Sequence, residues 1–163
     1  MDKVVDCPVY GRYLAPMAST PHWYDDLAMP ALLRGARAVY GAAIRDALVE
    51  AGCGDMPRDG AFVVGTIARN GSPLAEVITP LGLSKQRAGQ LVDTLVARGY
   101  LERASDPDDR RRMTLTLTER GRLAATAGRA ATERVDDALT TRVGADTVTR
   151  ARTALGALIE QAN

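Results

Sequence analysis

Apolar residues recur with a helical period along much of this chain, and residues that break helices separate the periodic segments. From Leu33 to Ala51, apolar side chains return every three or four positions, close to the 3.6-residue period of an amphipathic helix. The sequence GCGD at 52–55 ends this pattern. Residues 1–24 contain three prolines and show neither a helical nor a strand period. The pattern therefore predicts an extended N-terminal arm and then a first helix, which begins after Asp26.

Two short helices are predicted next, in close succession. Pro57 opens the first of them, and the Asn-Gly pair at 70–71 ends it. Ser72 caps the second, which has proline at its first helical position. That helix should end at Thr79, because the ring of the following proline disfavours helical geometry in the residue before it. The apolar side of the first of these helices is expected to consist of Ala61, Val64, Ile67 and Ala68.

A longer helix follows across a short turn that contains glycine. Ser84 can cap this helix, which the pattern predicts over residues 85–98. Two helices joined by a tight glycine turn form a helix-turn-helix. One side of the second helix is apolar, with Ala88, Leu91, Val92, Leu95 and Val96. Its opposite side is polar and rich in amides, with Gln86, Gln90 and Asp93, flanked by Lys85 and Arg87.

The segment after this helix has the pattern of a β-hairpin. Gly99 stands where a glycine commonly ends a helix, and Tyr100 can pack back on Leu95 as in a Schellman motif. A strand is predicted from residue 101 to 103, and MTLTLT at 113–118 alternates apolar residues with threonine, as a returning strand does. A hairpin that follows a helix-turn-helix is a wing, and its tip here carries three aspartates and three arginines.

Two more helices are predicted at the C-terminal end. Thr118 caps the first of them, and Glu119 is favourably placed at the positive end of its dipole. Both have apolar stripes that one small winged lobe cannot cover, so we infer a homodimer. The stripes consist of Leu123, Ala127, Ala131, Val135, Leu139 and Val143 in the first helix and Val148, Ala151, Leu155, Leu158 and Ile159 in the second.

Composition narrows the class of protein further. The chain of 163 residues is 25% charged and 46% hydrophobic, as ordinary globular domains are. No stretch approaches the roughly 18 apolar residues of a membrane span, and the N-terminal sequence lacks the apolar region of a secretory signal, so we expect a cytoplasmic protein without membrane association. Two cysteines and one histidine suit neither a disulfide framework nor a zinc site. We expect no metal, no cofactor and no enzymatic activity, because no catalytic set or phosphate loop is visible.

The charge distribution is compatible with nucleic-acid binding but does not establish it. The formal net charge is only +1, whereas residues 81–122 contain nine basic and six acidic side chains. Lys and Arg bind DNA by neutralising phosphates. An ordinary solvated surface explains so small a local excess about as well.

The sequences LGLSKQRAGQLVDTLVARGYLER and DPDDRRRMTLTLTERG resemble the MarR family of bacterial transcription regulators. The resemblance covers roughly residues 27–163 and is most specific over 72–121, where the strand entry, wing tip and next helix start follow in the family's order. It implies a mainly α fold with a small β-wing and a homodimer that binds pseudo-palindromic double-stranded DNA through recognition helices in the major groove. It also implies that Arg111 enters the minor groove while Asp109 orients it.

On this basis we expect a DNA-binding regulator, a repressor that responds to a small-molecule effector. The expected division is an arm at 1–24, a dimerisation and linking helix at 25–55, a winged helix-turn-helix at 56–118 and C-terminal dimerisation helices at 119–163. The residues expected to contact DNA are Ser72, Ser84, Lys85, Gln86, Arg87, Gln90, Asp109, Arg110, Arg111 and Arg112.

Other interpretations of several residues stay open. His22, Trp23 and Tyr24, with Tyr40 and Phe62, hold most of the few aromatic rings. His22, Trp23, Tyr40 and Phe62 could line an effector pocket. We favour the alternative that aromatic residues plug the arm onto the dimer core, because an arm with prolines needs an anchor. Cys7, and in the same way Cys53, could make the chain a redox-sensing regulator, which requires a thiol pKa depressed by cationic neighbours or a helix N-terminus; we favour the alternative that neither cysteine is a sensor. A winged fold can also be a protein-interaction module without an operator.

Overall fold

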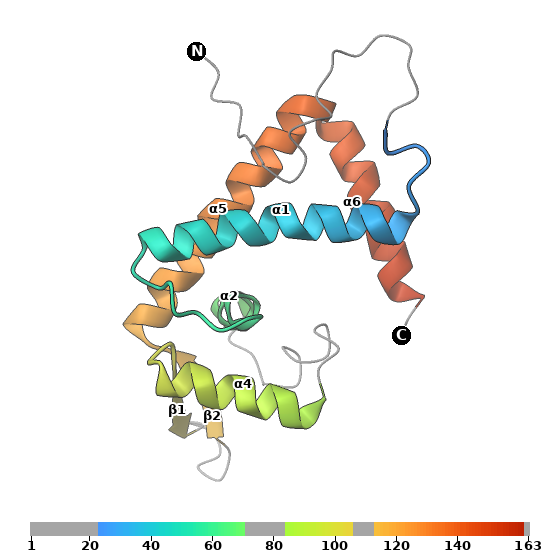
Figure 1. The fold of residues 1–163 in the computed structure, drawn as a ribbon. Coiled ribbons are helices and arrows are strands. Elements are labelled where there is room, and N and C mark those ends of the chain that lie inside the picture. The colour runs from blue at the N-terminus through green and yellow to red at the C-terminus, as the bar shows by residue number, and fades with distance from the viewer. Residues whose placement is uncertain (1–22, 71–83, 106–112, 162–163) are drawn as a thin grey trace. The chain divides into compact units, whose positions relative to one another are not determined.

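The computed structural model describes residues 23–70, 84–105 and 113–161 (Figure 1). The described fold is mainly helical with one two-stranded antiparallel sheet, as predicted. The predicted third helix and turn at 72–83 and most of the wing tip lie outside the described residues. Contacts divide the chain into two compact units, residues 1–38 and 39–163. The elements are α1 (Met29–Glu50), α2 (Gly60–Asn70), α4 (Lys85–Ala97), β1 (Leu101–Ser105), β2 (Met113–Leu117), α5 (Glu119–Val143) and α6 (Ala145–Glu160).

The described part of the first unit is the approach to α1 and the beginning of that helix. The rings of Trp23 and Tyr24 meet edge to face with their centroids 5.7 Å apart, and both side chains are exposed. The backbone N–H of Leu27 donates to the carbonyl of Tyr24 at 3.1 Å and closes a turn. The helix then begins at Met29, in agreement with the prediction that helicity starts after Asp26.

In the second unit, α1 ends at the predicted place. Gly52 has a φ of 71°, a conformation that glycine adopts without steric cost. The N–H of Gly52 donates to the carbonyl of Val49 at 3.0 Å, and the N–H of Cys53 donates to that of Leu48 at 2.7 Å, which together form a Schellman motif. This closure carries Cys53 into the core, where its side chain is almost fully buried.

The predicted start of α2 at Pro57 is wrong by three residues. The N–H of Gly60 donates to the carbonyl of Pro57 at 2.9 Å, and Asp59 has a φ of 64°, so these residues form a turn before the helix. Proline suits both the first position of a helix and a turn, and here the turn forms. The predicted apolar side is also partly wrong, because Val63 is buried with Val64 and Ile67 while Ala68 is exposed.

The recognition helix and hairpin form as predicted. Ser84 caps α4, and the buried side of the helix is centred on Val92 and Leu95. Gly99 has a φ of 71°, and the N–H of Tyr100 donates to the carbonyl of Leu95 at 2.9 Å, as in a Schellman motif. β1 is two residues longer than predicted, and its register with β2 pairs Leu101 with Leu117.

The start of α5 is joined closely to the end of α4. The Thr118 hydroxyl accepts from the N–H of Gly121 at 3.0 Å, which confirms Thr118 as the cap, and it donates to the carbonyl of Gly99 at 2.5 Å. A Cβ atom on Gly121 would lie 2.1 Å from the carbonyl oxygen of Tyr100, so only glycine allows the start of α5 to approach Tyr100 this closely. The core of the second unit lies around this junction and consists of Leu48, Cys53, Val63, Val64, Ile67, Leu95, Tyr100, Leu101 and Ala124.

The predicted stripes of the two C-terminal helices are only partly covered in the single chain. Ala131 is fully buried in α5, and Val148 of α6 is partly buried. A set of large apolar side chains on both helices remains at least 40% exposed: Leu123, Leu139, Val143, Leu155, Leu158 and Ile159. Gly144, with a φ of 84°, joins the two helices.

Candidate nucleic-acid interface

The exposed side of α4 presents the predicted recognition residues together. The Ser84 hydroxyl accepts from the N–H of Arg87 at 3.3 Å and so fixes the first turn of the helix. Lys85, Gln86, Arg87 and Gln90 are all exposed. None of these four side chains has a hydrogen-bond or ion-pair partner among the described residues. Their amide and cationic groups are therefore available to an external ligand.

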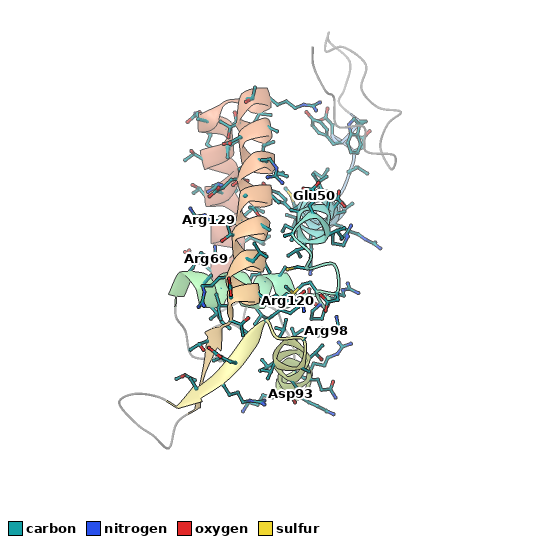
Figure 2. All side chains as sticks on the ribbon, turned by 90° about the vertical axis from the view of Figure 1, so that its left-hand side faces the viewer. Glu50, Arg69, Asp93, Arg98, Arg120 and Arg129 are labelled. Carbon is teal, nitrogen blue, oxygen red and sulfur yellow. The ribbon has the colours of Figure 1, made fainter. Side chains whose placement is uncertain are left out.

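The first wing strand is tied directly to this helix. Arg103 of β1 donates to the carboxylate of Asp93 on α4 at 2.5 Å, and the two form an exposed ion pair. Asp93 is labelled in Figure 2. The pair neutralises the acidic group on the polar side of α4, which would otherwise repel a phosphate. Exposed ion pairs contribute little stability, so its main effect is on orientation and local charge.

The base of the wing is described, and its tip is not. In the ladder, the Thr114 hydroxyl donates to the carbonyl of Ala104 at 3.2 Å and the Thr116 hydroxyl to the Glu102 carboxylate at 3.1 Å. Leu115 and Leu117 instead pack against the core, as the predicted alternation requires. Of the predicted DNA contacts, Ser72, Asp109, Arg110, Arg111 and Arg112 lie outside the described residues.

The structure adds a charged network that the sequence did not reveal, beneath the C-terminal end of α4. Buried Tyr100 donates from its hydroxyl to the Asp55 carboxylate at 2.5 Å and to the carbonyl of Cys53 at 3.3 Å. Arg120 donates to the same Asp55 oxygen at 2.6 Å and to the carbonyl of Arg98 at 2.6 Å. Its guanidinium carbon lies 4.3 Å from the centroid of the Tyr100 ring, a cation–π contact.

The ionisation of this network follows from its contacts. The hydrogen bond from Tyr100, followed by that from Arg120, lowers the pKa of Asp55. Burial, followed by the hydrogen bond to Asp55, raises the pKa of Tyr100. Both shifts favour one arrangement, in which an ionised carboxylate accepts from a neutral phenol and a charged guanidinium.

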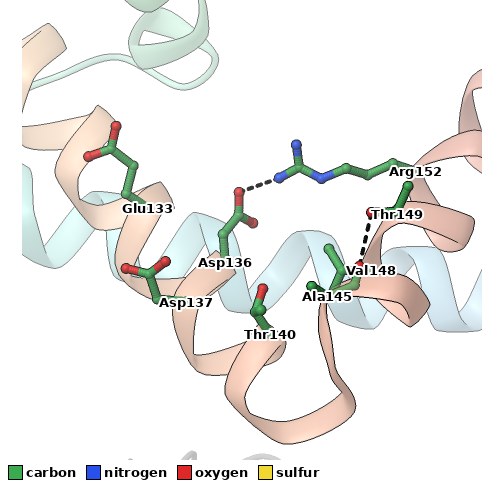
Figure 3. A pocket seen from close by; sticks show the side chains of 8 residues that line it. All are labelled: Glu133, Asp136, Asp137, Thr140, Ala145, Val148, Thr149 and Arg152. Atoms are coloured by element: carbon green, nitrogen blue, oxygen red, sulfur yellow. Dashed lines mark hydrogen bonds and ion pairs between the residues drawn. The ribbon is translucent and has the colours of Figure 1, made fainter.

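A second polar cluster joins α1, α5 and α6 within the second unit. The Tyr40 hydroxyl donates to Asp136 at 2.5 Å, and this hydrogen bond is the main cause that raises the pKa of Tyr40. Arg152 reaches from α6 to the other oxygen of the Asp136 carboxylate at 2.6 Å (Figure 3). Beside them lies an open cavity of about 370 Å³, lined by Glu133, Asp136, Asp137, Thr140, Ala145, Val148, Thr149 and Arg152.

Among the described residues, those predicted for an effector pocket do not line one cavity together. The ring of Trp23 meets that of Tyr24 edge to face, and the Tyr40 hydroxyl donates to Asp136. Phe62 lies on α2 with its side chain 40% exposed, and His22 lies outside the described residues. The pocket therefore remains a prediction, with Tyr40 the one member that contacts a residue lining the cavity.

Cys53 has the surroundings of a structural cysteine. Its side chain is 1% exposed, and the thiol donates to the carbonyl of Ala51 at 3.6 Å. A thiol that senses oxidants must be accessible, which Cys53 is not. Cys7 lies outside the described residues. Within the described ranges, no group of three His, Cys, Asp or Glu side chains could hold a metal ion, and no helix is long and apolar enough to cross a membrane.

Comparisons with known proteins agree with this architecture. A structure of the transcriptional repressor CouR bound to a 23-mer DNA duplex is similar with a TM-score of 0.64 and 24% identity, covering 82% of this chain and 93% of that one. A complex of Staphylococcus aureus MepR with DNA has a TM-score of 0.67 and 14% identity, covering 85% and 99%. MarR from Oenococcus oeni PSU-1 has a TM-score of 0.64 and 15% identity, covering 82% and 99%. No match was found among curated proteins.

The similarity to solved structures concerns the fold, while a sequence match concerns the family. Residues 55–112 match the sequence model of the MarR family. The matched segment runs from Asp55 of the charged network through α2 and α4 to the wing tip, and it contains the exposed polar side of α4. The MarR family consists of transcriptional regulators, not enzymes. Over residues 55–112, which include most of the predicted winged helix-turn-helix, this chain is similar to the MarR family.

Proposed function

We propose that this chain is a homodimeric regulator that binds double-stranded DNA sequence-specifically, with α4 of each protomer in the major groove. The observation that carries the proposal is the exposed side of α4, where Lys85, Gln86, Arg87 and Gln90 stand together without partners among the described residues. An interaction module has no need for two amides and two cations together on one exposed side of a helix.

The chemistry of these side chains suits the edges of base pairs. Glutamine can donate to and accept from adenine N6 and N7, and arginine can donate twice to guanine O6 and N7. We assign base contacts to Gln86, Arg87 and Gln90. Lys85 and Ser84, at the positive end of the helix dipole, suit phosphate oxygens, and we assign the backbone contact to them together with Ser72.

The symmetry of the proposed operator follows from the proposed dimer. Large apolar side chains of α5 and α6 are exposed in the single chain, and a second copy of the same chain could bury them. A two-fold dimer would present two α4 helices to half-sites about one helical turn, roughly 34 Å, apart. The operator should then be a pseudo-palindrome.

In this proposal the wing reads the DNA flanking each half-site. Arg111 enters the minor groove, Asp109 orients its guanidinium, and Arg110 and Arg112 contact phosphates. The supporting observation is at the base of the wing, where Arg103 ties β1 to α4 and so couples the wing to the recognition helix. Narrow A·T-rich minor grooves attract arginine most strongly.

We further propose that the regulator is a cytoplasmic repressor that a small-molecule effector releases from DNA. The repressor CouR has the same fold and was captured on a DNA duplex. An effector would act by changing the separation of the two lobes, so that the helices no longer match successive grooves. Of the four residues predicted to line the effector pocket, Tyr40 supports this proposal, because its hydroxyl contacts Asp136, which lines the cavity.

The proposal is tested by selecting duplexes from a random pool with the full-length chain. The expected result is a two-fold motif whose affinity falls steeply with salt, because several cationic side chains displace counterions. Gln90→Ala should weaken binding by about 1 to 3 kcal/mol and relax the preference at one position in each half-site. Glu50→Ala, at the exposed end of α1, is the control that should leave the motif unchanged. If no motif emerges and binding is flat with salt, the chain is an interaction module.

A further inference from the structure

Arg120, in the first turn of α5, contacts two segments that are far apart in the sequence, the loop between α1 and α2 and the turn between α4 and β1. Its guanidinium donates to the Asp55 carboxylate, between α1 and α2, at 2.6 Å. It also donates to the carbonyl of Arg98, the C-cap residue of α4, at 2.6 Å. It also lies over the ring of Tyr100, where β1 approaches. Figure 2 shows Arg98 and Arg120 close together on these neighbouring elements.

We propose that Arg120 is a positioning residue for DNA recognition, which holds the C-terminal end of α4 against α5 and so sets the angle at which the exposed side of α4 meets the major groove. The proposal rests on the proposed function, because it concerns the orientation of the helix assigned to base contacts. Arg120 itself is not assigned a contact with DNA.

The geometry of these contacts requires arginine. One terminal nitrogen of Arg120 donates to Arg98 and the other to the near oxygen of Asp55, so the planar fork spans two acceptors. A lysine ammonium is a point charge and cannot reproduce this fork together with the ring contact. Arg98 is also the cap residue of α4, so the guanidinium faces the negative end of that helix dipole.

The partners of Arg120 are themselves fixed in place. The Tyr100 side chain is fully buried and holds the Asp55 carboxylate at 2.5 Å. The Arg98 side chain returns a hydrogen bond to the backbone carbonyl of Asp55. Because Asp55 is held by Tyr100 and Arg98 as well as by Arg120, the network permits few alternative arrangements, which is what a positioning role requires.

A small change at this end of α4 is amplified at the other. At about 1.5 Å per residue, the 13 residues of α4 extend about 20 Å, so a rotation of about 10° about the C-terminal end moves the N-terminal end by about 3 Å. Lys85, Gln86 and Arg87 are at that N-terminal end. A displacement of this size is as long as a hydrogen bond and would remove the base contacts of Gln86 and Arg87 and the phosphate contact of Lys85.

Two matched pairs of variants separate positioning from charge. Arg120→Gln and Arg122→Gln each remove one cation from the first turn of α5, but the Arg122 guanidinium donates only to the carbonyl of Leu117 among the described residues. Asp55→Asn and Glu50→Gln each remove one anion, and Glu50 is exposed at the end of α1. If only long-range charge matters, removing the anion of Asp55 should strengthen DNA binding. If the network positions α4, Asp55→Asn should weaken binding, so the two explanations predict changes of opposite sign.

The measurement is the affinity of each full-length variant for a duplex selected by the unchanged chain and for a scrambled duplex of equal length. We expect Arg120→Gln to weaken selected-duplex binding about tenfold more than Arg122→Gln, which corresponds to a competent orientation populated about one tenth of the time. Arg120→Lys should resemble Arg120→Gln. Asp55→Asn should also weaken selected binding, while Glu50→Gln should not. Affinity for the scrambled duplex should fall equally in the two arginine-to-glutamine variants.

Thermal unfolding of each variant distinguishes positioning from loss of fold. The positioning role requires that the variants remain folded and equally oligomeric at the assay temperature. If Arg120→Gln does not fold, Asp55→Asn and Arg120→Lys carry the test. The inference is overturned if Asp55→Asn binds the selected duplex as well as the unchanged chain, or if the Arg120 and Arg122 variants lose equal affinity. If the unchanged chain selects no duplex, the proposed function fails first, and the inference fails with it.

Discussion

Replacing Gly121 by alanine should destabilise the winged lobe strongly, although alanine is the better helix former. A Cβ atom at this position would lie 2.1 Å from the backbone carbonyl oxygen of Tyr100 and 3.2 Å from a side-chain carbon of Leu117. The first contact is with the backbone, so it cannot be relieved by a change of rotamer. Either the start of α5 or the beginning of β1 must move.

The magnitude can be worked from the groups that must move. Forced overpacking costs about 1 to 3 kcal/mol and occasionally more, and a contact this short belongs at the upper end. Displacing the Tyr100 carbonyl also weakens its hydrogen bond from the N–H of Thr118, now 3.2 Å, at a cost of about 1 kcal/mol. Alanine returns about 1 kcal/mol through helix propensity. The net loss is about 3 kcal/mol, or about 6 to 12 °C in the unfolding temperature of a domain of this size.

Urea unfolding followed by circular dichroism, at one protein concentration because dimer stability depends on it, measures this loss. Gly65→Ala is the matched control, since a Cβ atom there meets nothing within 4 Å and Gly65 also lies inside a helix. That control should gain about 0.4 to 1 kcal/mol. Equal stabilities of the Gly121 and Gly65 variants would refute the close approach of α5 to Tyr100.

Three further changes test other parts of the molecule. Arg111→Ala should weaken operator binding by about 1 to 3 kcal/mol, and more on A·T-rich than on G·C-rich flanks, whereas Arg110→Ala should cost less; equal losses would make the wing a generic basic patch. Tyr40→Phe should lower stability by about 1 kcal/mol, because it removes the hydrogen bond to Asp136. The pKa of Tyr40 is raised in the folded chain. The difference in stability between the unchanged chain and Tyr40→Phe should therefore be constant below about pH 10, the ordinary pKa of tyrosine, and shrink as the pH rises beyond it. A difference that grows above this pH contradicts the contact. In a Cys7→Ser background, a thiol reagent should label Cys53 only when urea unfolds the chain, because that side chain is 1% exposed; labelling of the folded protein at the rate of a free thiol would contradict its burial.

The signals that could be predicted from the sequence act over a few residues. Ser84 and Thr118 accept from N–H groups three positions later, and Gly99 with Tyr100 closes the end of the helix that precedes them. Each motif carries its own geometry, so a single sequence suffices to find it. The predicted start of α2 at Pro57 is wrong because proline suits both the first position of a helix and a turn, and only the surrounding fold selects the turn.

The contacts that sequence reasoning missed join residues far apart along the chain. Asp55 and Arg120 are separated by 65 positions and Tyr40 and Asp136 by 96, and nothing in the spacing of either pair indicates contact. The expected closure of Tyr100 on Leu95 is present as a backbone hydrogen bond, but the Tyr100 hydroxyl bonds to Asp55 in a loop that precedes α2. The recognition residues on α4 could be proposed because exposure on a helix follows from its period, whereas their orientation depends on such distant contacts.

The closure at the base of the wing allows the tip of that hairpin to be replaced. Thr118 bonds to the carbonyls of both Gly99 and Tyr100, and the ladder continues to the pair of Ser105 and Met113, so the two ends of the wing tip are held together. Lengthening a loop whose ends are already held together costs only about 0.6 kcal/mol for each doubling of its length. Related chains could therefore exchange wing tips of different length and sequence without altering α4 or α5, and a tip grafted between Ser105 and Met113 should change the preferred flanking DNA alone.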